Sequence, residues 1–331
     1  MSEVNRSYHG QPVLKEPIWT WEIPTYFFTG GLAGASAGLA YLTELRGNEV
    51  LARRAWATSL GGIAFSPLFL ISDLGRPRRF LNMLRMFKVT SPMSVGSWIL
   101  AASGATTTVA ALDAWTGLLP RAGRFARPSA ALLGLPLSTY TAALIANTAV
   151  PVWHESHRLL PFVYGSGAAL TAGATAAAIT PPEHAAPARR LSIGSALIEV
   201  GVKELMHHRL GGHGEPYTHG VGAKFSHLSR ACNLAGAALM YARGARSRRA
   251  AMAAGALMCV GALSARWSTY KAGFESASDP KYVVGPQRAG IEEGRRSGAA
   301  RRKARVATGQ ATVPAVDRTA GSPATAPVAL D

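Results

Sequence analysis

The sequence predicts an all-α, polytopic membrane protein with eight transmembrane helices in two four-helix bundles. The main observation is the length of its uncharged runs, because a helix needs about 20 apolar residues to cross a bilayer. A soluble domain of this size would instead scatter charges through its helices at amphipathic spacing. Five runs contain no charged residue and no histidine: 23–43, 55–72, 89–112, 128–153 and 159–182.

Three weaker runs, 191–207, 225–242 and 248–271, complete the eight, and the resulting four hairpins favour the two-bundle arrangement. Charged residues interrupt the first of these runs, among them Glu199 and Lys203. These two residues are four apart, so an ion pair along one helix face is the leading interpretation. A proton-relay role is the alternative, because ionisable groups at membrane depth are costly.

The two ends of the chain differ from its middle in composition. Residues 1–22 are polar and lack a basic segment followed by a short apolar core, so no cleaved signal peptide is expected. Residues 23–272 form the expected membrane domain. Residues 273–331 are rich in Gly, Ala, Arg, Pro and Thr, which predicts a basic, disordered tail.

The net charge of +17 collects in this tail and in short clusters between the apolar runs. That distribution argues against a nucleic-acid partner and is compatible with membrane lipid. If there are eight spans, both termini lie on one side, together with the arginine-rich loop after residue 73. The positive-inside rule then predicts cytoplasmic termini in the plasma membrane, although the opposite loops also carry arginines.

Several kinds of redox and catalytic centre are not supported by the sequence. Cys232 and Cys259 are the only cysteines, and an iron–sulfur cluster held within the chain needs about four thiolates. None of the nine histidines lies in the middle of a clear span, so we expect no haem. We expect no metal site and find no motif for catalysis by this chain alone.

Small residues in the first span indicate helix packing. Gly30, Gly34 and Gly38 are four residues apart and therefore share one helix face. Small residues at this spacing let helices approach closely in lipid.

Ionisable residues that are far apart in sequence are expected to meet at one membrane face, because alternate span ends lie on the same side. Glu22 opens the first span, Asp73 closes the second, and His154 and Glu155 end the fourth. Tyr140 is expected near the middle of that fourth span. Interfacial placement and helix capping are the alternatives for the charged residues, and an aromatic belt is the alternative for the tyrosine.

Four stretches carry a resemblance to a known family. They are WTWEIPTYFFTGGLAG (19–34), DLGRPRRFLNMLR (73–85), SPMSVGSW (91–98) and NTAVPVWHE (147–155). Together they resemble the NrfD/PsrC family, the membrane subunits of polysulfide reductases and related molybdopterin oxidoreductases. The resemblance covers about residues 19–270 and implies an eight-helix protein without haem that exchanges electrons with menaquinone or ubiquinone.

The resemblance also implies partners and site residues. The partner would be a ferredoxin-like subunit with [4Fe–4S] clusters, which relays electrons to or from a molybdopterin catalytic subunit. By position, the quinone-binding residues would be Glu22, Tyr26 and Tyr140. The full set of further candidates is Asp73, His154, Glu155 and Glu199 for proton transfer, and Arg76, Arg78, Arg79 and Arg85 for partner docking.

Two other functions stay open at this point. Glu199, Lys203 and Glu204 inside a span are compatible with a proton-translocating subunit. A purely structural membrane anchor without a quinone site is the third possibility. Contact with anionic lipid is likewise the alternative role for the four arginines.

Overall fold

A computed structural model describes residues 14–285 and 291–294, and all regular structure in these residues is helical. The all-α prediction is therefore confirmed. Within the described residues, eight helices of 20 residues or more follow one another. They are α1 (Glu22–Leu45), α2 (Glu49–Asp73), α4 (Pro92–Thr116), α5 (Pro120–Ala146), α7 (Leu160–Ile179), α8 (Ala186–Leu210), α9 (Gly220–Arg243) and α10 (Arg248–Ser278).

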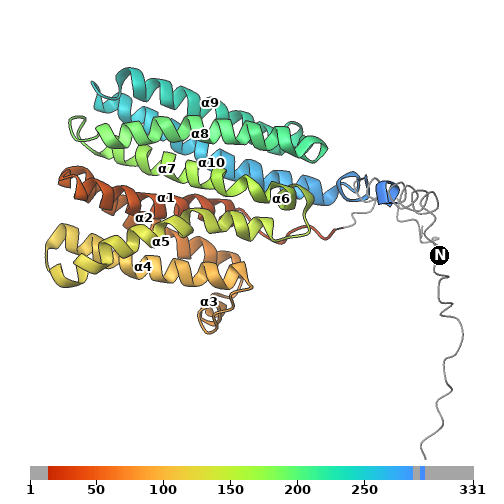
Figure 1. Ribbon diagram of the computed structural model, residues 1–331, viewed down its shortest axis with the longest axis horizontal. Helices are drawn as coiled ribbons and strands as arrows, with labels where there is room; N and C mark the ends of the chain where they lie inside the picture. The colour runs from red at the N-terminus through yellow and green to blue at the C-terminus, as the bar shows by residue number, and fades with distance from the viewer. Residues whose placement is uncertain (1–13, 286–290, 295–331) are drawn as a thin grey trace, which may run out of the picture. The chain divides into compact units, whose positions relative to one another are not determined.

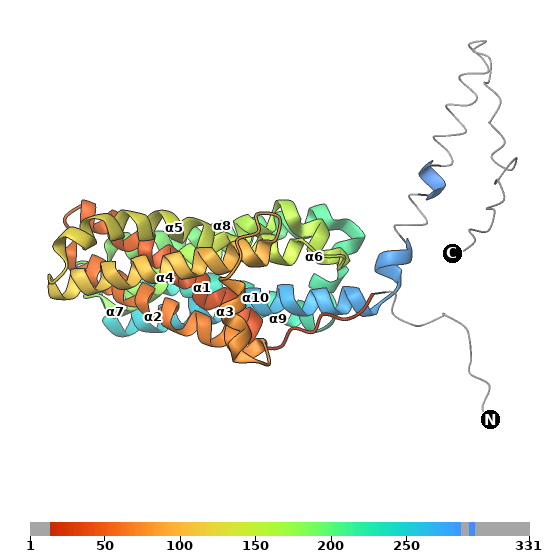
Figure 2. The same cartoon turned by 90° about the horizontal axis from the view of Figure 1, so that it is seen from below.

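Short helical segments connect some of these long helices. They are η1 (Pro77–Arg79) and α3 (Phe80–Met83) after α2, α6 (Pro151–Glu155) and η2 (Ser156–Arg158) after α5, and η3 (Gly211–Tyr217) after α8. Figures 1 and 2 place α3 and α6 at the same end of the long helices, the end at which α1 begins. We refer to it as the α6 end.

In the part of the chain that the structure describes, five helices are long and apolar enough to cross a membrane: α2, α4, α5, α7 and α10. Of the predicted clear spans, α1 is missing from this set because its Gly, Thr and Tyr residues lower its mean hydropathy. Conversely, α10 belongs to the set although the sequence made it one of the weaker candidates. Helices α8 and α9 carry several charged residues, as expected.

The fourth predicted span, 128–153, was wrong in its boundaries. Helix α5 begins at Pro120 and ends at Ala146, and a separate short helix, α6, begins at Pro151. The residue before a proline is disfavoured in the α conformation, and Val150 is indeed extended, with φ −68° and ψ 117°. Tyr140 is therefore six residues, or about 9 Å, from the end of its helix rather than in the middle of a span.

The loop after α2 begins with a sharp turn at Gly75. Helix α2 ends at Asp73, Gly75 adopts a positive φ of 64°, and Pro77 begins η1. A positive φ is easily accessible only to glycine, so the chain turns sharply here.

The structure describes only part of the predicted N-terminal segment and C-terminal tail. Helix α10 continues to Ser278, beyond the expected end of the membrane domain at residue 272. The chain divides into units 1–283 and 284–331, and the described residues 291–294 of the second unit form one helical turn. The predictions for the first 13 residues and for most of the tail lie outside the described residues.

Within residues 14–283, α1, α2, α4 and α5 lie on one side and α7, α8, α9 and α10 on the other, with α7 in contact with α1 and α5 (Figure 1).

The glycine face of α1 packs closely against α5 at Gly34, as predicted. A Cβ on Gly34 would clash with the carbonyl oxygen of Gly134 in α5, and the reverse is also true. Gly38 has no such neighbour within 4 Å. The backbones of α1 and α5 therefore touch at one crossing point.

Candidate functional site

A small cavity at the α6 end brings together three of the residues singled out from the sequence. Tyr26, Asp73 and Tyr140 line it, on α1, at the end of α2, and on α5. Its volume is about 40 Å³, enough for a few water molecules. Most of the remaining lining is apolar or aromatic: Trp19, Ile23, Phe27, Leu70, Leu74, Met83, Met93 and Leu144, with Ser97 as a further polar residue.

Tyr26 is the most deeply placed polar residue of this cavity. Its side chain is 1% exposed, and its hydroxyl has no hydrogen-bond partner among the described residues. Buried hydroxyls are nearly always hydrogen-bonded, to protein or to bound molecules. The Tyr26 hydroxyl is therefore a donor that is free for water or for a ligand oxygen.

Tyr140 is half-buried and occupies a notch in the neighbouring helix α4. The notch is Gly96, because a Cβ at that position would clash with the Tyr140 ring. Gly96 lies in the stretch S-P-M-S-V-G-S-W that begins α4, and the next residue, Ser97, lines the cavity. This motif thus helps to fix the position of the tyrosine ring.

Asp73 and Glu22 are joined through a residue that the sequence did not single out. The Thr20 backbone N–H and hydroxyl both donate to Asp73 Oδ1, at 3.1 and 2.8 Å. The same hydroxyl contacts Glu22 Oε2. A hydroxyl has one hydrogen, so it can donate to one carboxylate while accepting from the other acid in its protonated form. Glu22, Thr20 and Asp73 thus form a short polar chain from the cavity wall.

Asp73 forms no ion pair with the arginines that follow it in the described part of the chain. Asp73 is bonded to Thr20, and Arg76 is exposed. Arg78, Arg79 and Arg85 are exposed as well, and none of the four arginines forms an ion pair with a described residue. They form an accessible basic surface beside the cavity.

The other predicted proton-transfer residues lie away from the cavity. His154 and Glu155 are exposed on α6. Glu155 lines a separate surface hollow of about 570 Å³ with residues such as Arg209 and His213. Glu199 is fully buried in α8, where its carboxylate accepts a hydrogen bond of 2.9 Å from Asn233.

The predicted ion pair between Glu199 and Lys203 is absent from the described part of the chain. The Lys203 ammonium donates instead to Ser229 at 3.0 Å. Partners on α9 therefore replace the pairing along α8 that the spacing favoured. Arg266, also buried nearby, was missed, although an arginine inside an apolar run is itself a signal.

Aromatic contacts connect the cavity wall to α10. Trp19 stacks on Trp153 of α6, with 5.5 Å between the ring centroids. The Trp153 indole N–H donates to the Thr269 carbonyl at 2.7 Å, and the Tyr270 hydroxyl donates to the Trp19 carbonyl at 2.5 Å. The segment before α1 is therefore held in place by α6 and α10.

Residues 7–278 match a family model described as polysulfide reductase. This match spans more than half of the chain and contains every residue of the cavity. The chain belongs to the polysulfide reductase family. The resemblance to NrfD-type proteins is thereby confirmed, and the chain is a membrane protein with several apolar helices. A search of curated proteins finds no match.

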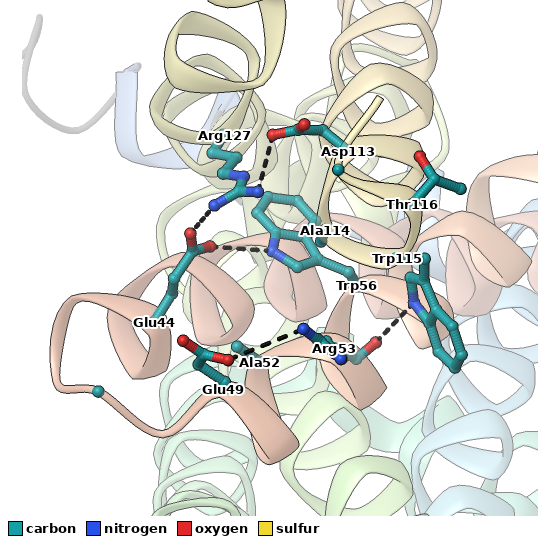
Figure 3. Close-up of a pocket in the computed structure, with 12 residues that line it drawn as sticks. Glu44, Glu49, Ala52, Arg53, Trp56, Asp113, Ala114, Trp115, Thr116 and Arg127 are labelled. Carbon is teal, nitrogen blue, oxygen red and sulfur yellow. Dashed lines mark hydrogen bonds and ion pairs between the residues drawn. The ribbon is translucent and has the colours of Figure 1, made fainter. Parts of the chain in front are cut away.

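This polysulfide reductase-family chain has a second polar centre at the opposite end of the helices, which the sequence did not reveal. Figure 3 shows Arg127 of α5 between Glu44 of α1 and Asp113 of α4. The guanidinium lies 2.7 Å from Asp113, and Glu44 also accepts from the Trp56 indole at 3.3 Å. They line a hollow of about 380 Å³. Because each charge has a partner, this network best explains how three helices are held together.

Metal binding finds no support in the described residues. Among them, no group of three or more His, Cys, Asp or Glu side chains is arranged to hold an ion. The polar residues of the cavity are hydroxyl and carboxylate groups, which suit hydrogen bonding to a neutral oxygen-containing ligand.

Proposed function

We propose that this chain is the quinone-reactive membrane subunit of a molybdopterin oxidoreductase complex. Membership of the polysulfide reductase family supports the class of complex. The observation that carries the assignment is the unpartnered Tyr26 hydroxyl, buried in an apolar cavity that also contains Tyr140 and Asp73. Menaquinone and ubiquinone each have an apolar ring with two carbonyl oxygens. A site for either therefore needs apolar surfaces and hydrogen-bond donors together.

Each polar residue has a role in this chemistry. The Tyr26 and Tyr140 hydroxyls donate hydrogen bonds to the quinone carbonyl oxygens. Reduction of the quinone takes up two electrons and two protons, and oxidation of the quinol releases them. Asp73, Thr20 and Glu22 carry these protons between the cavity and the surface, because their side chains already form a connected chain.

The cavity must widen to admit a quinone. Ligand pockets usually measure about 300–1,000 Å³, whereas this cavity measures about 40 Å³. Met83 and Met93 line it, and Met93 is 45% exposed. Methionine side chains are flexible and repack readily, so their movement opens the site.

The complex requires partners outside this chain. The exposed arginines at 76, 78, 79 and 85 dock a ferredoxin-like subunit with [4Fe–4S] clusters. An acidic surface on that subunit would be attracted electrostatically to these arginines. That subunit passes electrons to or from the molybdopterin catalytic subunit. In this proposal all eight long helices span the plasma membrane as two four-helix bundles, and both termini are cytoplasmic.

The quinone site is tested by turnover of the purified complex with a quinone substrate. Tyr26→Phe, Tyr140→Phe and Glu22→Gln should each lower turnover, by about tenfold for a lost hydrogen bond of roughly 1.5 kcal/mol. Tyr241→Phe is the control, because Tyr241 is 82% exposed on α9. Unchanged turnover in both Tyr140→Phe and Glu22→Gln would remove this site and leave a structural anchor.

The partners are tested separately by purification in mild detergent with metal analysis. We expect iron and molybdenum to co-purify with the chain. Replacing the four arginines together with glutamine should release both metals. Recovery of the native chain without either metal would contradict the proposed complex.

A further inference from the structure

Four polar side chains are buried together between α8, α9 and α10. Glu199 and Lys203 belong to α8, Asn233 to α9 and Arg266 to α10, and their exposed fractions are 0%, 6%, 0% and 2%. Charged residues at such depth are rare, because removing a charge from water is costly. The cluster is not part of the cavity that contains Tyr26 and Tyr140.

The charged groups of this cluster are held apart by neutral partners. Asn233 donates to Glu199 Oε2 at 2.9 Å, and Lys203 donates to the Ser229 hydroxyl at 3.0 Å. Arg266 donates to the Tyr164 carbonyl of α7 at 2.8 Å, and its guanidinium lies 4.0 Å from the centre of the Tyr164 ring. No ion pair joins these acids and bases in the described part of the chain.

Several polar atoms of the cluster have no protein partner among the described residues. These atoms are Glu199 Oε1, Asn233 Oδ1, and Arg266 Nε and Nη1. Orphaned buried polar atoms are uncommon, and ordered water usually satisfies them. Because donors and acceptors occur together here, the cluster is a suitable site for bound water.

Two glycines make room for the cluster. A Cβ on Gly167 of α7 would lie 3.0 Å from Arg266 Nη2 and 3.1 Å from Glu199 Oε1. A Cβ on Gly261 of α10 would clash with Asn233 Oδ1. These notches in the facing helices accommodate the polar groups, which indicates that the cluster is built into the packing.

The charges of the cluster do not balance when all its groups are ionised. Glu199 supplies one negative charge, whereas Lys203 and Arg266 supply two positive charges. Arginine does not release its proton in proteins, but a buried lysine can. The cluster is neutral only when Lys203 is an uncharged amine.

The charged and titratable groups around Lys203 leave this count unchanged. Glu204 and Arg230 form their own ion pair, and Tyr164 is neutral near pH 7. The charged groups that act on Lys203 are Glu199 and Glu204 on α8, Arg230 on α9 and Arg266 on α10. His207 on α8 also feels Lys203 and lies near His227 on α9, and Arg266 lies against Tyr164 on α7.

Polar residues follow one face of α8 from Glu199 to His207, toward the α6 end. Glu199, Lys203 and His207 are spaced four residues apart on α8, so each step covers about 6 Å along one face. The His207 ring stacks on Tyr217 of η3, with 4.7 Å between centroids, and its Nε2 has no partner among the described residues. Beyond it, the hollow with Glu155, Arg209 and His213 opens at the surface.

We propose that Lys203 is a proton-exchanging group within the α7–α10 helices, a role separate from the quinone site. Its ammonium releases one proton, which passes by bound water to His207 Nε2 and then to the surface hollow beside α6 and η3. The neutral amine takes a proton back along the same route. Glu199, Asn233 and Arg266 set the electrostatic field around Lys203. No group is oxidised or reduced in this exchange.

The state of Lys203 is measurable by solid-state NMR of the full chain in liposomes, with ¹⁵N at the side chains of its seven lysines. We expect one lysine to change between ammonium and amine at a pH at which the other six remain ammonium. Its signal should disappear in Lys203→Met and in the charge-retaining Lys203→Arg. It should persist in Lys224→Met, which changes an exposed lysine of α9.

Two further variants test the field and the route. Glu199→Gln removes the nearby anion, so the change should move to lower pH by about one unit or more. The control Glu204→Gln changes an exposed acid one residue from Lys203 and should move it less. His207→Phe should keep the amine signal but slow proton exchange after a pH jump by at least tenfold.

Contrary results are equally clear. Seven lysines that change charge state together, or a separate amine signal that survives in Lys203→Met, would overturn the proposal. An unaltered exchange rate in His207→Phe would overturn the route. These spectra need no quinone, and Tyr140→Phe should leave them unchanged, so this proposal and the quinone site fail independently.

Discussion

The ring of Tyr140 on α5 lies against the backbone of Gly96 on α4, so closely that any side chain at position 96 would displace it. The two residues are 44 positions apart, and each belongs to a stretch that helps to form the cavity. Ser97 follows Gly96 and lines the same cavity. The position of the tyrosine hydroxyl therefore depends on a glycine, a residue without a side chain.

Gly96→Ala should move the Tyr140 ring and reduce quinone-linked turnover at least tenfold. Overpacking of this kind costs about 1–3 kcal/mol, part of which the ring relieves by leaving its position. Gly104→Ala on the same helix is the matched control, because a Cβ there meets only Ile63, at 3.9 Å. Equal turnover in the two variants would mean that the ring position does not matter.

Arg127 should be important for stability but not for turnover. Arg127→Met leaves Glu44 and Asp113 facing each other without a cation, and the Asp113 side chain is 5% exposed. We expect a loss of about 2 kcal/mol in the free energy of unfolding, below the 3–5 kcal/mol of fully buried pairs. Thermal unfolding in detergent measures the change.

Arg53→Met is the control for this network. Arg53 and Glu49 are exposed and 3.8 Å apart, so their pair should contribute less than about 1 kcal/mol. A similar effect of both substitutions would show that the Arg127 network is only a surface pair.

The contact between Glu215 of η3 and Lys281 should weaken in acid. Lys281 donates to Glu215 at 3.0 Å, and this bond holds the pKa of the Glu215 carboxyl below its usual value. A lowered pKa in the folded chain means stabilisation that is complete above the ordinary glutamate pKa of about 4.3. It is lost as the pH falls through the lower, folded value.

Amide hydrogen exchange near residues 215–220 detects this loss. Comparing the native chain with Glu215→Gln at each pH cancels the intrinsic dependence of exchange on pH. The two chains should differ at neutral pH and become alike as the pH falls through the folded pKa of the Glu215 carboxyl. High salt should also reduce the difference, because both side chains are about half exposed. A difference that persists after the carboxyl is protonated would assign it to another contact.

Hydropathy alone predicted most of the fold, because crossing a membrane imposes a length and an absence of charge on each helix. The error at the end of α5 was avoidable, since Pro151 was visible in the sequence and restricts the residue before it. Parity of the spans correctly brought Asp73 toward the start of α1. Span parity could not predict the role of Thr20. Its bond to Asp73 joins positions 53 apart and depends on the path of the segment before α1.

The buried cluster shows where local spacing fails. Glu199 and Lys203 have the spacing of a helical ion pair, but Asn233 and Ser229 on α9 are their hydrogen-bond partners. Sequence spacing describes one helix, whereas these bonds depend on the rotation of α9 about its axis. Arg127 was missed for the same reason, because its partners lie on α1 and α4.

The crossing of α1 and α5 gives a prediction with an internal control. Gly34→Ala places a methyl group against the carbonyl oxygen of Gly134, which must move because it belongs to a helix backbone. We expect a loss of about 2 kcal/mol in the free energy of unfolding. Gly38→Ala, one turn along the same helix, meets no atom within 4 Å. It should be neutral or stabilising by up to about 1 kcal/mol, because alanine favours helix more than glycine does. Thermal unfolding of the two variants in the same detergent measures the contrast, and equal stability would show that α1 and α5 can separate at this crossing without loss.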